Sequence, residues 1–229
     1  MTTGCYKEQI NYGEEKYRNR NDSMTNVLDP DDFQDAVNKA ADFILSGRLV
    51  AFPTESFYGL GVDATNEDAI KRLFLIKQRE LNRPILILIS SEAVLSRFVE
   101  RIPPVAYQLM EEFWPGGLTL VFEAGQKLSP LLTGGTGKIG IRVSSHPVVM
   151  SLTRAVGRPI SGTSANISGK SACIDASEVL KVFGDRVDFT LDGGRLEGKT
   201  GSTVLDVTVC PPKILRRGII TKDQLDEFI

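Results

Sequence analysis

The residues best suited to chemistry are cations that follow a predicted helix. Lys77, Arg79 and Arg83 lie in a stretch, 71–83, that holds five basic residues and one acidic residue. The chain of 229 residues has 27 basic and 29 acidic residues, a formal net charge of −2, so this positive charge is a local feature. Such a cluster indicates a binding site for an anion. A solvated helix end is the alternative: it explains the first two cations of the stretch, and for Lys77 and Arg79 both interpretations stay open.

Hydroxyl, amide and guanidinium groups also gather after predicted strands. Arg142 ends an apolar strand, so its guanidinium must leave the sheet edge, where it is suited to clamp a carboxylate or phosphate. Segment 161–169 combines hydroxyls, an amide and two glycines, and segments 54–58, 201–203 and 216–218 are similar in character. Each segment alone is typical of a turn. Together, at strand ends where open α/β sheets bind ligands, they predict a site for phosphate and carboxylate groups.

Several familiar chemistries do not fit the composition. His146 is the one histidine of the sequence, which excludes zinc sites with two or three histidines. A helix-start or surface role explains His146 best. The three cysteines have no paired spacing, so neither a disulfide framework nor a cysteine-based zinc site is expected. Residues 134–138 resemble a phosphate loop, but the Ser or Thr that should follow the lysine is absent.

Hydrophobic patterning predicts the elements that must position these groups. Strands are predicted at 49–52, 84–89, 118–122, 139–143, 159–162, 203–207 and near residue 189, with helices starting near 32, 66, 93, 105, 148, 177 and 221. Strands that alternate with helices indicate an α/β domain with a mainly parallel or mixed sheet. Residues 1–28 are polar and lack a period, which predicts a disordered tail before one domain over 29–229. No apolar run reaches the ~18 residues of a membrane span.

The spacing of Lys77 and Arg79 gives a specific expectation for the helix that starts near residue 66. Two residues that lie two positions apart do not share a helical face. Both cations can therefore reach one site only if the helix ends between residues 76 and 80. We expect a helix end there, with two exposed cations directed at the 161–169 loop.

Seven motifs follow one another in a specific order between residues 50 and 218. They are PTESFYGLG at 53–61, KQR at 77–79, WPGGLT at 114–119, IRV at 141–143, TSANISG at 163–169, GSTV at 201–204 and ILRRG at 214–218. In this order and spacing, the sequence resembles the YrdC-like family of L-threonylcarbamoyl-AMP synthases in its short, single-domain form.

The resemblance implies a twisted, open mixed sheet flanked by helices, with a large concave substrate cavity. It implies a nucleotidyltransferase that joins L-threonine, bicarbonate or CO₂, and ATP into threonylcarbamoyl-AMP and pyrophosphate. Mg²⁺ would be bound through the triphosphate, without a metal site made by the protein. A downstream threonylcarbamoyl-transferase complex would modify tRNA, contact with tRNA or double-stranded RNA is a further expectation, and a cytoplasmic location is expected.

Roles for individual residues also follow from the resemblance, motif by motif. Lys77 and Arg79 are the expected catalytic residues. The expected ATP-binding residues are Lys77, Arg79, Arg83, Asn166 and Arg216, and the expected threonine-binding residues are Thr54, Ser56, Tyr58, Arg142, Ser164 and Ser202. Ser56, Arg83, Leu88 and Lys138 depart from residues common in the family. Some relatives have a histidine in place of Leu88, so a threonine contact is expected to be missing or replaced there.

Two other functions are compatible with parts of the sequence. A non-catalytic module could bind double-stranded RNA through basic groups, although a pI near 5.6 disfavours this as a sole role. A dinucleotide-dependent enzyme could use the Gly59-x-Gly61 pattern, although these glycines lie beyond the strand end rather than in the turn itself. The salt dependence of RNA binding would test the first function, and NAD binding would test the second.

Overall fold

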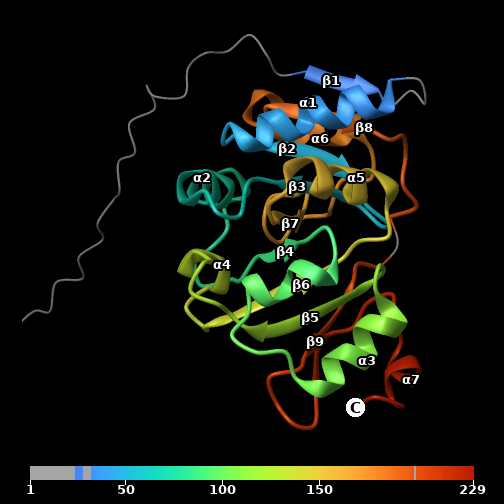
Figure 1. Ribbon diagram of the computed structural model, residues 1–229. Coiled ribbons are helices and arrows are strands. Elements are labelled where there is room, and N and C mark those ends of the chain that lie inside the picture. Colours follow the sequence, from blue (N-terminus) through green and yellow to red (C-terminus); the bar gives the residue numbers. More distant parts are fainter. Residues whose placement is uncertain (1–23, 28–31, 199) are drawn as a thin grey trace, which may run out of the picture.

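The strands form one ten-stranded mixed sheet within residues 24–27, 32–198 and 200–229, which the computed structural model describes (Figure 1). They are β1 (Met24–Val27), β2 (Val50–Pro53), β3 (Tyr58–Gly61), β4 (Leu86–Leu88), β5 (Leu118–Glu123), β6 (Lys138–Arg142), β7 (Ile160–Ser164), β8 (Phe189–Asp192), β9 (Thr203–Asp206) and β10 (Lys213–Arg216). Their order in the sheet is β1-β8-β2-β3-β7-β4-β6-β5-β9-β10. The sheet is mixed because β2, for example, pairs parallel with β8 and antiparallel with β3.

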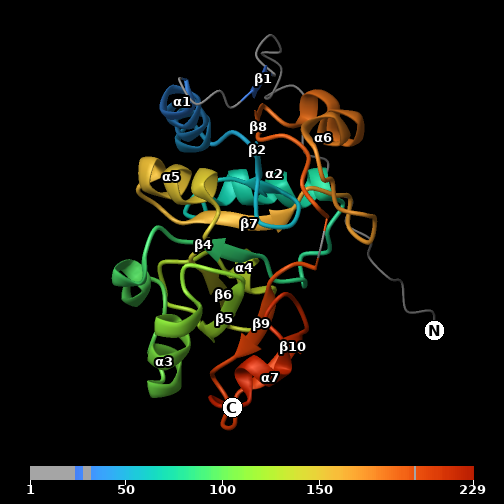
Figure 2. The same ribbon diagram turned by 90° about the vertical axis from the view of Figure 1, so that its right-hand side faces the viewer.

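Helices cover both faces of this sheet. They are α1 (Phe33–Leu45), α2 (Glu67–Lys77), α3 (Pro104–Phe113), α4 (Pro130–Thr133), α5 (Pro147–Val156), α6 (Ala176–Phe183) and α7 (Lys222–Leu225), with the 3₁₀ segments η2 (Glu92–Arg97) and η3 (Gly184–Arg186). Figure 2 shows α1 and α5 on one side of β2 and β8, and α6 on the other. Burial alternates accordingly, because Val50 and Phe52 pack in the core with α1 and α5 while Ala51 packs in the opposite core. The predicted α/β class, with a mixed sheet flanked by helices, is confirmed.

Local sequence signals set several helix boundaries. The Asn66 side chain accepts a hydrogen bond from the Ala69 amide at 3.1 Å and so caps α2. Asp175 caps α6 in the same way, through the Glu178 amide at 2.8 Å. At the other end of α2, Gln78 adopts a left-handed conformation with φ of 50°, which stops the helix after Lys77. The predicted helix end between residues 76 and 80 is therefore correct.

The predicted tail boundary is wrong in one respect. Residues 24–27, which were expected to belong to a tail over 1–28, form β1 and pair in parallel with β8, with Thr25 opposite Thr190. A four-residue strand carries too little pattern to be recognised, and its pairing depends on a partner more than 160 residues further along the chain. The rest of that prediction concerns residues 1–23 and 28, which lie outside the described residues.

Strands β3 and β10 and the short helix α4 were not predicted. Strand β3 has the sequence Tyr-Gly-Leu-Gly, and glycine is unfavourable in strands. Its glycines make room for the ring of Phe52, since a Cβ at Gly59 or Gly61 would lie 3.0 or 2.6 Å from that ring. The Gly59-x-Gly61 pattern therefore serves packing within the sheet and is not a dinucleotide-binding turn. Strand β10 is an exposed edge strand, so it shows no alternation of apolar and polar residues.

No helix within the described ranges is long and apolar enough to cross a lipid bilayer.

Candidate active site

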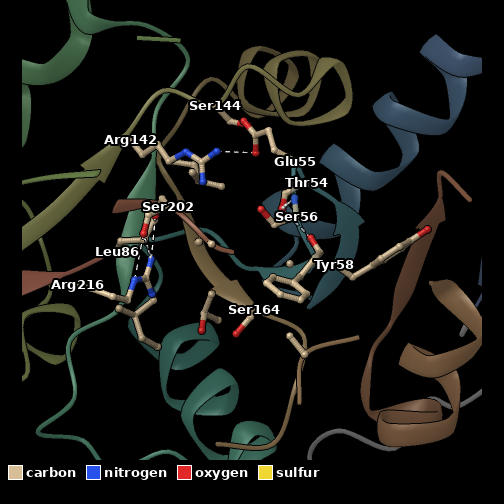
Figure 3. Close-up of a pocket in the computed structure, with 18 of the residues that line it drawn as sticks. Thr54, Glu55, Ser56, Tyr58, Leu86, Arg142, Ser144, Ser164, Ser202 and Arg216 are labelled. Atoms are coloured by element: carbon tan, nitrogen blue, oxygen red, sulfur yellow. Dashed lines mark hydrogen bonds and ion pairs between the residues drawn. The ribbon is translucent and has the colours of Figure 1, made fainter. Parts of the chain in front are cut away.

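A cavity of about 440 Å³ opens where the middle strands of the sheet and their connecting loops meet (Figure 3). Most of the predicted site residues line it: Thr54, Ser56, Tyr58, Arg79, Arg142, Ser164, Ser202 and Arg216. They come from the β2–β3 turn, the segment after α2, the ends of β6, β7 and β10, and the residue before β9. Lys77, Arg83 and Asn166, which were also predicted, are not among the lining residues.

The cavity wall carries an excess of positive charge. Its charged lining residues are Arg79, Arg142, Arg216, Arg217 and Glu55. Arg217 and Glu55 belong to motifs noted in the sequence, but neither was predicted as a site residue. Because four cations face one carboxylate in a chain whose net charge is −2, the cavity is suited to an anionic ligand.

Glu55 and Arg142 form an ion pair on one side of the cavity. Arg142 Nη2 lies 2.5 Å from Glu55 Oε2, and Arg142 Nε donates to the Gly116 carbonyl oxygen at 2.7 Å. Burial alone would raise the pKa of Glu55, but the Arg142 charge and the hydrogen bonds that the carboxylate accepts lower it to about 2. Glu55 is therefore ionised throughout the physiological pH range and is too weak a base to accept a proton there.

Arg216 and Ser202 are joined by hydrogen bonds in another part of the cavity wall. The Arg216 guanidinium donates from Nε and Nη2 to the Ser202 carbonyl oxygen, at 3.1 and 2.8 Å, and from Nη2 to Ser202 Oγ at 2.9 Å. Ser202 Oγ is also hydrogen-bonded to Thr119 Oγ1 at 2.8 Å. Burial, followed by the charge of Arg142, lowers the pKa of Arg216. Arg216, a predicted ATP ligand, and Ser202, a predicted threonine ligand, thus hold each other in place.

This contact depends on the absence of a side chain at Gly218. A Cβ at that position would lie 2.3 Å from the Ser202 carbonyl carbon and 2.3 Å from the Thr203 amide nitrogen. We expect Gly218→Ala to lower the free energy of unfolding by about 1–3 kcal/mol, because the backbone must move away from the start of β9. Gly201→Ala is the matched control, since its Cβ would meet only Arg216 Nη2, at 3.8 Å. Urea denaturation measures both variants, and equal stabilities would contradict the prediction.

Lys77 lies behind the cavity wall rather than in it. Its side chain is 1 % exposed. The ammonium donates to the Ser164 carbonyl oxygen, to the Asn166 carbonyl oxygen at 2.9 Å and to Asn166 Oδ1 at 3.3 Å. Burial, followed by the charge of Arg79, lowers its pKa to about 7. The expectation that Lys77 is an exposed cation is wrong, whereas the expectation that it faces the 161–169 loop is correct.

Arg79 takes a different direction. Its Nε donates to the Arg83 carbonyl oxygen at 3.2 Å and its Nη2 to the Pro84 carbonyl oxygen at 2.7 Å. The guanidinium thus makes its hydrogen bonds along the 83–84 segment, and of the two cations that were expected to face the 161–169 loop, Lys77 is the one that hydrogen-bonds it. The cause is the left-handed Gln78, which turns the chain between the two cations. Arg79 nevertheless lines the cavity, as does Ser164.

The remaining polar residues of the predicted threonine pocket use their hydroxyls within the protein. Thr54 Oγ1 donates to the Phe57 carbonyl oxygen at 2.7 Å, and Ser56 Oγ donates to the Thr200 carbonyl oxygen at 2.8 Å. Tyr58 donates to the Gly194 carbonyl oxygen at 2.9 Å, away from the cavity, and burial raises its pKa. The contacts of Ser56 and Tyr58 hold the β2–β3 turn and the start of β3 against residues 200 and 194. Leu88 supplies apolar surface to the wall, at the position where some relatives have a histidine.

Arg83 and Asn166 are the predicted ATP ligands that lie outside the cavity wall. Arg83 pairs with Glu80 at 3.3 Å and its side chain is 57 % exposed. Asn166 Nδ2 donates to the carbonyl oxygens of Ile167 and Lys170, at 3.0 and 2.7 Å, so its amide organises its own loop. In the part of the chain that the structure describes, no group of three or more His, Cys, Asp or Glu side chains is arranged to hold a metal ion.

Fold and cavity together define an α/β protein with a cationic, hydroxyl-lined ligand site over a mixed sheet. The family model Sua5_yciO_yrdC, whose description reads "Telomere recombination", matches residues 42–218. The chain belongs to this Sua5/YciO/YrdC family.

Three comparisons illustrate the relationship. The protein named threonylcarbamoyl-AMP synthase of Pyrococcus abyssi (strain GE5 / Orsay) is 39 % identical over 190 residues, which are 83 % of this chain and 56 % of that protein. The protein of the same name from Bacillus subtilis (strain 168) is 37 % identical over 207 residues, or 90 % of this chain and 59 % of that protein. The crystal structure of P. abyssi Sua5 complexed with L-threonine aligns with a TM-score of 0.83 at 38 % identity, covering 86 % of this chain and 58 % of that one. The chain therefore spans less than three-fifths of the length of these relatives.

Proposed function

We propose that this domain synthesises threonylcarbamoyl-AMP from L-threonine, bicarbonate or CO₂, and ATP, with release of pyrophosphate. The observation that carries the proposal is the cavity in which four arginines face one already paired carboxylate. The names of the curated relatives and the L-threonine complex of P. abyssi Sua5 support the identity of the substrates. The product would serve threonylcarbamoyladenosine modification of tRNA, through a downstream transferase complex.

The proposed chemistry needs positioning and charge stabilisation more than acid–base groups. The threonine amine attacks carbon dioxide, forms an N–C bond and loses a proton, which gives a carbamate. A carbamate oxygen then attacks the α-phosphorus of ATP, the bond to the β-phosphate oxygen breaks, and pyrophosphate leaves. Negative charge develops on phosphate oxygens in this step, and fixed guanidinium groups stabilise it. Mg²⁺ would enter bound to the triphosphate and would neutralise part of its charge.

The arginines divide into two groups in this proposal. Arg142, with Ser202 and Ser164 nearby on the cavity wall, would bind the carboxylate and hydroxyl of threonine. Arg79 and Arg216, joined by Arg217, would bind the triphosphate and the charge that develops on it. Lys77 would hold the loop of Ser164 and Asn166 in place from outside the cavity. It would thus be important for the reaction, as predicted, but through a different contact.

The alternative of a non-catalytic double-stranded RNA-binding module has less support. Binding to a duplex needs basic residues spread over an exposed face, whereas the arginines that carry this proposal line a cavity. Contact with tRNA, the downstream complex and a cytoplasmic location stay predictions.

The test is a mass balance of the reaction. We expect pyrophosphate release from ATP to require both L-threonine and bicarbonate, with threonylcarbamoyl-AMP detected by mass spectrometry in equal amount. The reason is that the α-phosphorus is attacked only by the carbamate, which forms from both co-substrates. Reactions without threonine or without bicarbonate are the controls, and pyrophosphate released equally well in either would contradict the proposal.

A further inference from the structure

Glu55 has an unusual environment for a carboxylate at a ligand site, because hydrogen-bond donors surround one of its oxygens and the other lies buried against the Arg142 guanidinium. Oε1 accepts from Ser144 Oγ at 2.7 Å, from the Ser145 amide at 2.8 Å and Ser145 Oγ at 3.0 Å, and from the His146 amide at 3.3 Å. Oε2 lies 2.5 Å from Arg142 Nη2. The carboxylate thus joins the β2–β3 turn to the N-terminus of α5 and to the end of β6 (Figure 3).

These contacts leave Glu55 no capacity to bind a substrate. Four donors occupy one oxygen, and the other oxygen, although it accepts no hydrogen bond, is buried against the guanidinium, so an incoming amine would have to displace an internal partner. Glu55 also does not act as a general base, since its pKa lies at about 2. Glu55 must therefore act through the groups that it contacts.

Arg142 is the cavity group that Glu55 controls. Its guanidinium has two fixed contacts, Nε with the Gly116 carbonyl oxygen at 2.7 Å and Nη2 with Glu55. With both contacts made, the plane of the guanidinium is fixed, and Nη1 is the group left for a ligand. Without Glu55, one contact would remain, and the guanidinium could rotate about its bond to the Arg142 side chain. A preorganised arginine binds a carboxylate more tightly because less side-chain freedom is lost on binding.

We propose that Glu55 is a positioning residue, which fixes the guanidinium of Arg142 so that Nη1 binds the carboxylate of the amino-acid substrate. This inference rests on the function proposed above. Glu55 then transfers no proton and contacts no substrate. It orients Arg142, the arginine that selects an amino acid.

Glu55→Gln is the most informative variant because it keeps the size of the side chain but replaces one of two equivalent acceptor oxygens with an NH₂ group. A carboxylate accepts hydrogen bonds at both oxygens, whereas an amide accepts at one end and donates at the other. Whichever way the amide is oriented, its NH₂ group faces donors, either those at the start of α5 or Arg142 Nη2. The variant therefore cannot satisfy both sides, and Arg142 loses its second anchor or the α5 contacts are broken.

The experiment measures the affinities of the purified 229-residue wild-type chain and its Glu55→Gln variant for L-threonine and for ATP separately, by calorimetry. We expect the threonine affinity of Glu55→Gln to fall at least tenfold and the ATP affinity to change less than threefold. Ser145→Ala is one control, since it removes one of four donors to Oε1 and leaves the Arg142 contact in place. We expect its threonine affinity to stay within threefold of wild type.

Asp188→Asn is a second control, matched in chemistry. Asp188 accepts from Arg72 through both carboxylate oxygens, and it is 22 % exposed, close to the 19 % of Glu55. It does not line the cavity. This variant should lower the melting temperature without a change in threonine affinity. It therefore separates the loss of an arginine–carboxylate pair in general from the loss of the pair that positions Arg142.

The outcomes separate the two proposals. Wild-type protein that binds no L-threonine would overturn the proposed function and this inference with it. Wild-type protein that binds threonine, together with a folded Glu55→Gln that binds it equally well, would overturn the inference alone. An equal loss of threonine and ATP affinity would also overturn it, since that pattern indicates collapse of the whole site. If Glu55→Gln does not fold, Glu55→Asp takes its place: it keeps the charge but is one methylene shorter, and unchanged threonine affinity would contradict the proposal.

Discussion

Arg79→Ala is expected to lower kcat for threonylcarbamoyl-AMP formation by about 10²–10³-fold, the effect typical of removing one preorganised electrostatic group, about 2.7–4 kcal/mol. Two backbone carbonyls, of Arg83 and Pro84, hold the guanidinium of Arg79 at the cavity wall. The group is thus fixed before substrate arrives, which is the condition for a large effect. Because Arg79 makes two hydrogen bonds within the described part of the chain, the free energy of unfolding should change by only about 1–2 kcal/mol.

Arg83→Ala tests whether this effect belongs to position 79 or to positive charge in general. Arg83 lies four residues further on, is more than half exposed and pairs with Glu80 outside the cavity wall. We expect its effect on kcat to be at least tenfold smaller than that of Arg79→Ala. Arg79→Lys should recover only part of the rate, because an ammonium lacks the planar fork that contacts both carbonyls. Rates are measured as adenylate formed with saturating ATP, threonine and bicarbonate, and near-wild-type synthesis by Arg79→Ala would show that this assignment is wrong.

Much of the fold follows from local sequence signals. The cap at Asn66, the apolar face of α1 and the almost wholly apolar run around β4 are each readable within one short window. Strand β3 was not predicted because its two glycines make room for the ring of Phe52, which lies next to them in space. Strand β1 was missed because its stability comes from pairing with β8, at the other end of the chain. Short windows carry no information about such pairings.

The candidate site, like the fold, could be predicted only in part from the sequence. Motifs placed eight of the eleven expected residues on the cavity wall, since polar groups at strand ends gather at one edge of an open sheet. The roles of Glu55 and Lys77 could not be predicted, because each is defined by partners about 90 residues away in sequence. The sequence signal for Glu55 was a charged residue inside a motif of hydroxyls, but the role of Glu55 can be recognised only from the positions of Ser144 and Arg142.

Lys77→Met is expected to lower the free energy of unfolding at pH 9 by about 1–3 kcal/mol. Methionine keeps the apolar stem of the side chain and removes the donor. The Asn166 carbonyl oxygen then loses its donor in a site where the lysine is 1 % exposed, whereas the Ser164 carbonyl oxygen and Asn166 Oδ1 keep the Asn166 amide and Ser164 Oγ as donors, at 3.0 and 2.7 Å. A buried acceptor without a partner costs about 1–3 kcal/mol. The 161–169 loop would also lose its fixed position, so adenylate synthesis should fall even though Lys77 does not line the cavity.

Lys71→Met is the matched control for this variant. Lys71 lies on the same helix and pairs with Glu67 at 2.7 Å, but its side chain is 39 % exposed. An ion pair four residues apart on a helix surface contributes only about 0.3–0.5 kcal/mol. Comparable losses of stability in the two variants would contradict the burial argument for Lys77.

The pH dependence of the Lys77 effect gives an independent test with a defined sign. Burial and the charge of Arg79 hold the pKa of Lys77 at about 7, below the ~10.4 of a lysine in an unfolded chain. Between these values the unfolded chain binds a proton that the native protein does not bind, so raising the pH stabilises the native state by up to about 1.4 kcal/mol per pH unit. The stability difference between wild type and Lys77→Met should therefore increase from pH 7 to pH 9 and should be nearly constant below pH 6. Urea denaturation of both proteins across this range measures it, and a difference that stays constant or decreases above pH 7 would show that the native state keeps Lys77 charged.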